Sequence, residues 1–384
     1  MGPLARLVFL LAALAVALAG GLVPARHTRA SAGQLVRVGI LLAQPAVAVS
    51  LPAPATIGDP ASQQAEVLPA GTYEFRPVTG GITGAGRSYG PIVRLQPTSG
   101  PLAVGPRAYR GVIELRRAGE GITVVNELDV EEYLYGVLKM EVDPRWPTET
   151  LKAQAVAART LAFASLGRFA AEGYDLRATT DSQVYGGVNA EDPRTTAAVD
   201  VTRGVVATFG GRPIFAAYHA DSGGMTEASE LVWGVAYPYL RSVPDPWVEG
   251  SPVGQWLTRI DLPELEARLR RAGRPVSGVT GIEVAALSPS GRVLAVRVTG
   301  GHGTLELKGT ELRMLVGVSV LRSTLFTVRL VPNDEVAAAE FQGRGSGHGV
   351  GLSQWGARGM GLAGRSYVEI LQYYYRGVQV ERRY

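Results

Sequence analysis

The sequence predicts an α+β protein with a mixed, β-rich core, several helices and a small β-rich unit at its N-terminus. Short β-type runs such as TYEFRPV and GVIELRR, separated by Gly and Pro, fill residues 34–117. Two segments with the hydrophobic spacing of helices follow between residues 129 and 164. Later helix-like and strand-like segments mix without a regular β-α-β alternation. This irregular mixture favours α+β over a doubly wound parallel sheet.

The composition limits the classes of protein to which the chain can belong. The chain has 384 residues, 46% of them hydrophobic, which suffices for two domains or for one large domain with an accessory module. The formal net charge of +4 comes without any Lys/Arg run, so we expect no nucleic-acid partner. The absence of cysteine excludes disulfides, a lipid-modified cysteine and thiolate zinc sites.

Residues 1–32 predict an export signal or an N-terminal membrane anchor. Arg6 precedes an apolar run that begins at Leu7, and small-x-small patterns at residues 17–19 and 30–32 are two candidate cleavage sites. Because the apolar character continues weakly beyond the first of these sites, an uncleaved anchor remains the alternative. Either segment predicts an extracytoplasmic protein of the cell envelope.

Residues 33–108 predict a β-rich accessory region. No cluster of titratable residues stands out in this region. We therefore favour structural support or glycan binding over a catalytic role for it, since sites in such modules are mostly carried by loops.

Glu141 stands at the joint between two predicted helices. Asp129 is placed to cap the first helix, Pro144 and Pro147 end it, and Pro147 also suits the first position of the second helix. The spacing predicts one buried face on each helix. These faces comprise Val130, Tyr133, Leu134, Val137 and Met140 on the first helix, and Leu151, Ala155, Ala158, Ala162 and Phe169 on the second.

A glutamate at such a joint is either a solvated helix-end residue or a working acid. The second helix carries Lys152 and Arg159 two turns apart on one side, with Gln154 near them. It can therefore present two cations and an amide toward the turn that displays Glu141. Burial raises the pKa of a carboxyl group and a nearby cation lowers it, and the sequence leaves their order open.

Two later segments hold further candidates. In YHADSGG, His219 is only three residues from Ser222 and is a poor general base for it, so a Ser-His-Asp triad is excluded and a structural turn or a ligand loop remains. The segment GRGSGHGVGLSQWG matches no nucleotide motif. Its His348, Gln354 and Trp355 suit a sugar, and the alternative is a glycine-rich packing loop.

Four segments, in this order, resemble the stage II sporulation protein D family, which includes amidase-enhancer-like proteins. They are NELDVEEYLYGVLKMEVDPRWPTETLKAQAVAARTLA, TTDSQVYGG, YHADSGGMTEASELVWGVAYPYLRSV and GRGSGHGVGLSQWGARGMGLAGRSYVEILQYYYRGV. The resemblance marks residues 109–384 as the catalytic domain. It implies a peptidoglycan lytic transglycosylase that acts on peptide-free glycan strands, with a catalytic groove between the helical and β parts.

The resemblance also assigns residues. It places the catalytic acid at Glu141 and a functionally important basic pair at Lys152 and Arg159. The implied substrate contacts are Tyr185, His219, Ser222, His348 and Gln354. To these we add Gln154, which lies on the same predicted helix as Lys152 and Arg159. Some family members bind zinc through cysteines, and because this chain has none, we expect neither a metal nor another cofactor.

Three functions remain open at this stage. A lytic transglycosylase needs a single acid, and we expect it in a partly apolar pocket, with Lys152 and Arg159 bound to substrate or engaged elsewhere rather than paired tightly to Glu141. The second hypothesis is a non-catalytic wall-binding protein that stimulates a cell-wall amidase. The third is a structural envelope protein that does not bind glycan.

Overall fold

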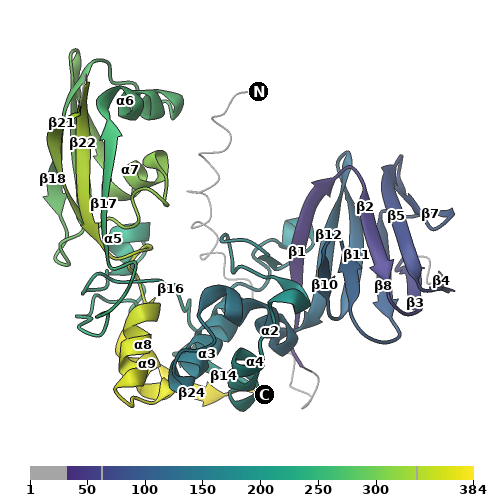
Figure 1. Cartoon of the computed structure of the whole chain (residues 1–384). Coiled ribbons are helices and arrows are strands. Elements are labelled where there is room, and N and C mark those ends of the chain that lie inside the picture. The colour runs from purple at the N-terminus through teal and green to yellow at the C-terminus, as the bar shows by residue number, and fades with distance from the viewer. Residues whose placement is uncertain (1–32, 62–63, 334–335) are drawn as a thin grey trace. The chain divides into compact units, whose positions relative to one another are not determined.

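The computed structural model describes residues 33–61, 64–333 and 336–384, and it confirms the predicted α+β class (Figure 1). The predicted export signal or anchor at residues 1–32 lies outside the described residues. The described chain forms two compact units, which we call the first and the second unit. The first unit comprises residues 33–216, 364–371 and 378–384, and the second comprises residues 217–363 and 372–377.

The N-terminal half of the first unit consists of two sheets. One has seven strands, in the order β13 (Leu176–Arg177), β1 (Leu35–Gln44), β12 (Gly121–Asp129), β11 (Val112–Ala118), β8 (Ile92–Pro97), β3 (Ala55–Asp59) and β4 (Gln64–Leu68). The other has six, in the order β10 (Arg107–Tyr109), β9 (Leu102–Val104), β2 (Val47–Leu51), β5 (Gly71–Val78), β6 (Gly81–Gly84) and β7 (Arg87–Tyr89).

Alternation of side chains builds the core of these sheets. In β2, for example, Val47, Val49 and Leu51 are buried and the two residues between them are not. One continuous hydrophobic cluster joins residues of both sheets to the helices that follow. The predicted boundary between residues 108 and 109 is therefore not a boundary in the structure: β11 and β12 pair directly with the earlier strands β8 and β1.

Three helices complete the first unit. They are α2 (Val130–Glu141), α3 (Thr148–Ala164) and α4 (Pro193–Val201), with short 3-10 turns at η2 (Ala170–Glu172) and η3 (Gly187–Ala190). A small sheet of β15 (Arg212–Pro213), β14 (Val205–Phe209) and β24 (Gln379–Arg382) lies beside them. The predicted buried faces are confirmed apart from Met140, which is 47% exposed, and Phe169, which is half-buried and lies beyond the end of α3 at Ala164.

The second unit has its own core of strands and helices. Three strands pair in the order β17 (Gln255–Asp261), β22 (Val336–Arg344) and β21 (Phe326–Asn333), and three more in the order β18 (Val279–Leu287), β19 (Val293–Gly300) and β20 (Gly303–Lys308). Helices α6 (Leu262–Arg271) and α7 (Gly309–Val316) pack in the same hydrophobic cluster. The remaining elements are α5 (Ser229–Trp233), α8 (Gln354–Leu362) and a parallel pair of β16 (Tyr218–His219) with β23 (Leu352–Ser353).

Helix α9 (Tyr367–Tyr374) runs from one unit into the other along the chain. Its Tyr374 and the adjacent Tyr375 have no exposed surface and belong to the core. In the described part of the chain, no helix has the length and apolar character needed to cross a membrane.

Asp129 offers a direct test of how α2 is held. Its carboxylate accepts a hydrogen bond of 2.8 Å from the Glu131 backbone N–H, as predicted for an N-cap. We expect Asp129→Ala to lower the free energy of unfolding by about 1 kcal/mol, because the first turn loses this partner. Urea denaturation followed by far-UV circular dichroism measures the change, and Glu120→Ala, at an exposed turn, is the control. Equal stability of the two variants would contradict the capping role.

Candidate functional site

Glu141 is the last residue of α2 and is half-buried. Its Oε1 accepts a hydrogen bond of 3.3 Å from the Val184 backbone N–H, which fixes the direction of the carboxyl group. The chain then turns into a small apolar cluster that contains Val142, Trp146 and Leu151. Glu141 thus lies at the joint of two helices, next to a small apolar cluster, and the partly apolar pocket predicted for its carboxyl group stays a prediction.

The core next to Glu141 contains aromatic residues. Tyr133, eight residues before Glu141 on α2, is fully buried, and its hydroxyl donates to the Gln183 side chain at 3.2 Å. Burial, with the nearby charge of Glu141 adding to it, raises the pKa of Tyr133. Tyr133 also packs against the ring of Tyr185 at 5.0 Å between centroids. These rings support the end of α2 from below.

Lys152 is partly buried and bonded to a neighbouring carboxylate. Its Nζ lies 2.7 Å from Glu149 Oε1, and the second oxygen of Glu149 accepts the Tyr367 backbone N–H at 2.8 Å. Burial opposes ionisation of Glu149, but these donors prevail and lower its pKa. The prediction that Lys152 is engaged elsewhere than with Glu141 is confirmed, and its role as a substrate contact stays a prediction.

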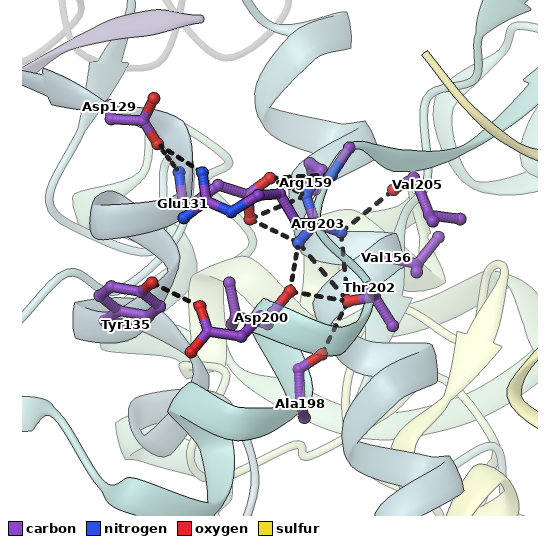
Figure 2. Close-up of polar contacts among 12 residues, drawn as sticks. Asp129, Glu131, Tyr135, Val156, Arg159, Ala198, Asp200, Thr202, Arg203 and Val205 are labelled. Carbon is purple, nitrogen blue, oxygen red and sulfur yellow. Dashed lines mark hydrogen bonds and ion pairs between the residues drawn. The ribbon is translucent and has the colours of Figure 1, made fainter. Parts of the chain in front are cut away.

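Arg159 has no exposed surface. Its guanidinium is bonded to Glu131, with Nη2 at 2.6 Å and Nε at 3.0 Å from the carboxylate oxygens (Figure 2). The prediction that Arg159 is engaged elsewhere than with Glu141 is therefore also confirmed. The substrate contact predicted for it is corrected, because a side chain enclosed on all sides cannot meet a glycan strand in this fold.

Two other predicted contacts of the first unit are also buried. Tyr185 is 1% exposed, and its hydroxyl donates to Asn126 Oδ1 at 2.9 Å. Gln154 is 1% exposed, and neither polar atom of its amide has a hydrogen-bond partner among the described residues. Both belong to the interior that supports α2 and α3, and the substrate contacts predicted for them are corrected on that ground.

Ser222 belongs to a buried hydrogen-bond network of the second unit. Its hydroxyl donates to Asp245 Oδ2 at 2.7 Å and accepts the Gly224 backbone N–H at 3.1 Å, and Tyr374 donates to the other Asp245 oxygen at 2.9 Å. Burial raises the pKa of Asp245 against the lowering effect of these donors. Ser222 has no exposed surface, so the substrate contact predicted for it is corrected. The exclusion of a serine triad agrees with this geometry, because the Ser222 hydroxyl bonds to a carboxylate and not to an imidazole.

Two histidines and a tryptophan form a second group in this unit. The rings of His219 and His348 lie 5.4 Å apart, and that of Trp233 lies 5.1 Å from His348. His348 Nδ1 accepts the Val350 N–H at 3.0 Å, and His219 Nδ1 lies 3.1 Å from the Val350 carbonyl. His348 keeps some exposure, whereas His219 is buried and its Nε2 has no partner among the described residues.

Gln354 begins α8 directly after its cap, Ser353, whose hydroxyl accepts the Gly356 N–H. The Gln354 side chain is 7% exposed, with Nε2 buried and without a partner among the described residues. The substrate roles of Gln354, His219 and His348 stay predictions. Glu141 and Lys152 belong to the first unit and these three to the second, and the predicted common groove also stays a prediction.

Several polar residues, among them Glu132, Asp245 and Arg292, were not singled out from the sequence. Burial raises the pKa of Glu132, a half-buried carboxyl group on α2, and that of Asp245. Arg292 is 1% exposed, donates to the Ser222 carbonyl at 2.6 Å and has its pKa lowered by burial to about 10. No sequence motif marks them, because each acquires its environment from distant segments. No group of three or more potential metal ligands occurs within the ranges that the structure describes.

Comparison with known proteins gives two family matches. Residues 118–209 match the family described as stage II sporulation protein, and residues 248–351 match a domain family of unknown function. The first match contains Glu141, Lys152 and Arg159. The second begins after Asp245 and ends within the glycine-rich segment.

Curated relatives align over most of the chain. Stage II sporulation protein D of Bacillus amyloliquefaciens is 33% identical over an alignment of 273 positions, which covers 67% of this chain and 75% of that protein. The protein of the same name from Bacillus subtilis is 32% identical and covered to 75%. The amidase enhancer of Bacillus subtilis is 30% identical over an alignment of 362 positions, which covers 80% of this chain and 49% of that protein.

The two histidines predict a pH-dependent stability. Burial lowers the pKa of His348 from 6.5 to about 4, and it lowers that of His219 in the same direction. Between these pH values the unfolded chain binds more protons than the folded one, so folding is fully favoured above pH 6.5 and loses stability as the pH falls toward 4. Because the His348 ring is partly exposed, we expect a loss of about 2 kcal/mol from this residue.

Urea denaturation at pH 6.5 and pH 4.5 measures this loss. His348→Gln should reduce the difference between the two pH values without removing it, since His219 still contributes. His302→Gln, at an exposed position of the second unit, should keep the full difference. A wild-type stability that does not change between the two pH values would contradict the assignment.

Proposed function

The chain belongs to the stage II sporulation protein D family, and on this premise we propose that it is an exported peptidoglycan lytic transglycosylase with Glu141 as its catalytic acid. A cell-wall role agrees with both the sporulation protein and the amidase enhancer among its relatives. Its substrate is the glycan strand without stem peptides, and the bond cleaved lies between N-acetylmuramic acid and N-acetylglucosamine.

The chemistry requires one carboxyl group in two successive roles. Protonated Glu141 gives its proton to the glycosidic oxygen as the bond from that oxygen to the muramic C1 breaks. The carboxylate then takes the proton of the muramic C6 hydroxyl, whose oxygen bonds to C1 and closes a 1,6-anhydro ring. The proton lost in the first step is recovered in the second, and water does not enter the product. Glycoside hydrolases, in contrast, usually need a second carboxylate.

The observation that supports this role is the setting of the Glu141 carboxyl group. A tight ion pair would hold a carboxylate ionised and unable to donate a proton. In this structure the two basic side chains of the neighbouring helix bond to other carboxylates, Lys152 to Glu149 and Arg159 to Glu131. The Val184 N–H meanwhile orients the half-buried Glu141. A directed carboxyl group that is bonded to neither of these two cations suits acid and then base catalysis.

One substitution tests the proposal. We expect Glu141→Gln to reduce release of anhydro-ended sugars from denuded glycan strands by at least about 100-fold, because the amide cannot transfer the proton. Binding to the strands should remain. Mass spectrometry of the released sugars measures the reaction, since the anhydro product is lighter by one water than the product of hydrolysis.

Glu132→Gln is the matched control. Glu132 lies on the same helix and has a pKa raised by burial, so it is the rival acid within the first unit. Retained release in Glu132→Gln supports Glu141. Lost release in Glu132→Gln with retained release in Glu141→Gln would transfer the role to Glu132.

The alternative is a non-catalytic protein that stimulates a cell-wall amidase. The relative named amidase enhancer favours it. A wild-type protein that releases no anhydro sugars, but accelerates an amidase on intact peptidoglycan, would establish this second function. Stimulation that survives Glu141→Gln would show that it does not depend on glycan cleavage.

A further inference from the structure

The ion pair of Glu131 and Arg159 lies entirely inside the first unit. Neither side chain has any exposed surface. The guanidinium uses its fork, with Nε and Nη2 both directed at the Glu131 carboxylate, and its outer nitrogens donate to the carbonyl oxygens of Val205 at 3.0 Å and Val199 at 3.2 Å (Figure 2). A guanidinium held in this way has a single geometry, since its donors are planar and fixed.

The Glu131 carboxylate is equally saturated. Oε1 accepts the Gly204 backbone N–H at 3.0 Å and the hydroxyl of Tyr384 at 2.7 Å, in addition to Arg159. The ring of Tyr384 packs edge-on against Phe163 of α3, 5.8 Å between centroids. The buried charges are thus joined to α2, α3, the end of α4, β14 and the segment after β24. The reaction chemistry uses none of these groups.

The pair joins Glu131 of α2 to Arg159 of α3, and it therefore constrains the position of α2 along the axis of α3. Glu131 lies in the first turn of α2 and Glu141 is its last residue, so one unbroken helix of about 15 Å joins the two carboxyl groups. Because α2 moves as a rod, a shift at Glu131 is passed to Glu141. There it would change the hydrogen bond between the carboxyl group and the Val184 N–H, which belongs to a different segment.

We propose that Glu131, Arg159 and Tyr384 are positioning residues, which set the register of α2 and thereby place the carboxyl group of Glu141. The inference deepens the proposed function and rests on it for its catalytic consequence. It assigns Arg159 to the support of the acid and gives Tyr384, 243 positions after Glu141 in the sequence, a part in the same task.

Tyr384→Phe tests the proposal more gently than substitution of either charged partner, which leaves a buried charge alone and endangers folding. It removes only the hydroxyl bonded to Glu131 and keeps the ring that packs on Phe163. Tyr135→Phe is the matched control. Tyr135 lies on α2, as Glu131 does, and its hydroxyl makes a solvent-exposed hydrogen bond of 2.6 Å to Asp200, outside the buried pair.

Kinetics on denuded glycan strands separate positioning from binding. We expect Tyr384→Phe to lower kcat by about 10-fold with KM unchanged, because the acid is displaced relative to the bond it protonates. Tyr135→Phe should change neither constant. A raised KM with unchanged kcat would make the network a substrate-binding element and overturn the proposal, as would an unchanged kcat.

Amide hydrogen exchange provides a readout that does not need turnover. Peptides that cover residues 142–147 and 183–186 should exchange several-fold faster in Tyr384→Phe than in the wild type or in Tyr135→Phe, with the strands of the N-terminal sheets unchanged. If the wild type releases no anhydro sugars, the proposed function fails and this measurement alone decides the register. Unchanged exchange in Tyr384→Phe would then overturn the positioning role.

Discussion

The ion pair between Glu131 and Arg159 is the interaction on which the helical part of the first unit depends. Two charges without solvent contact are tolerated only when geometry and hydrogen bonds compensate for lost hydration, and removal of one partner typically costs about 3–5 kcal/mol. Here the compensation comes from backbone groups after α4 and at β14, and from Tyr384. Segments separated by more than 200 residues must therefore be in place before the pair is stable. The position of the acid is a property of the assembled unit rather than of the motif around Glu141.

Local signals predicted the helices well. The cap at Asp129, the end of α2 before the prolines and the alanine spacing of α3 each act within a few residues, and the structure confirms them, although Pro147 is the N-cap of α3 and not its first residue. Met140 was predicted as buried by the same spacing, but it lies near the end of α2, where the helix no longer faces the core. The boundary at residue 108 failed for a different reason. Pairing of β1 with β12 joins residues that are far apart in the sequence, such as Leu35 and Asp129. Local composition cannot predict such a contact.

The site shows the same division between local and distant information. Residue type and resemblance identified Glu141 and Lys152 as candidates, and the structure confirms that Lys152 bonds to a carboxylate other than Glu141, while the roles of both stay predictions. For Arg159 the sequence did contain a warning, because its position falls on the stripe of Ala155, Ala158 and Ala162 that the spacing predicted as buried. An arginine on a buried stripe requires a buried acid, and Glu131 was available one helix earlier. The buried partner of Arg159 is thus consistent with the helical spacing, whereas a substrate contact is not.

The glycine-rich segment of the second unit shows why His219 and Ser222, in a different segment, are buried. Gly345, Gly347, Gly349 and Gly351 all have positive φ, and a Cβ atom at these positions would lie within 2.2–2.7 Å of the Asp221 carbonyl, the His219 side chain, the Arg292 guanidinium and the Ala217 carbonyl, respectively. The absence of side chains is thus used for close packing. This contact encloses His219 and Ser222, and it favours the packing interpretation over an open sugar face. The residues of this motif build a rigid element, and the carboxyl chemistry proposed for the protein belongs to the first unit.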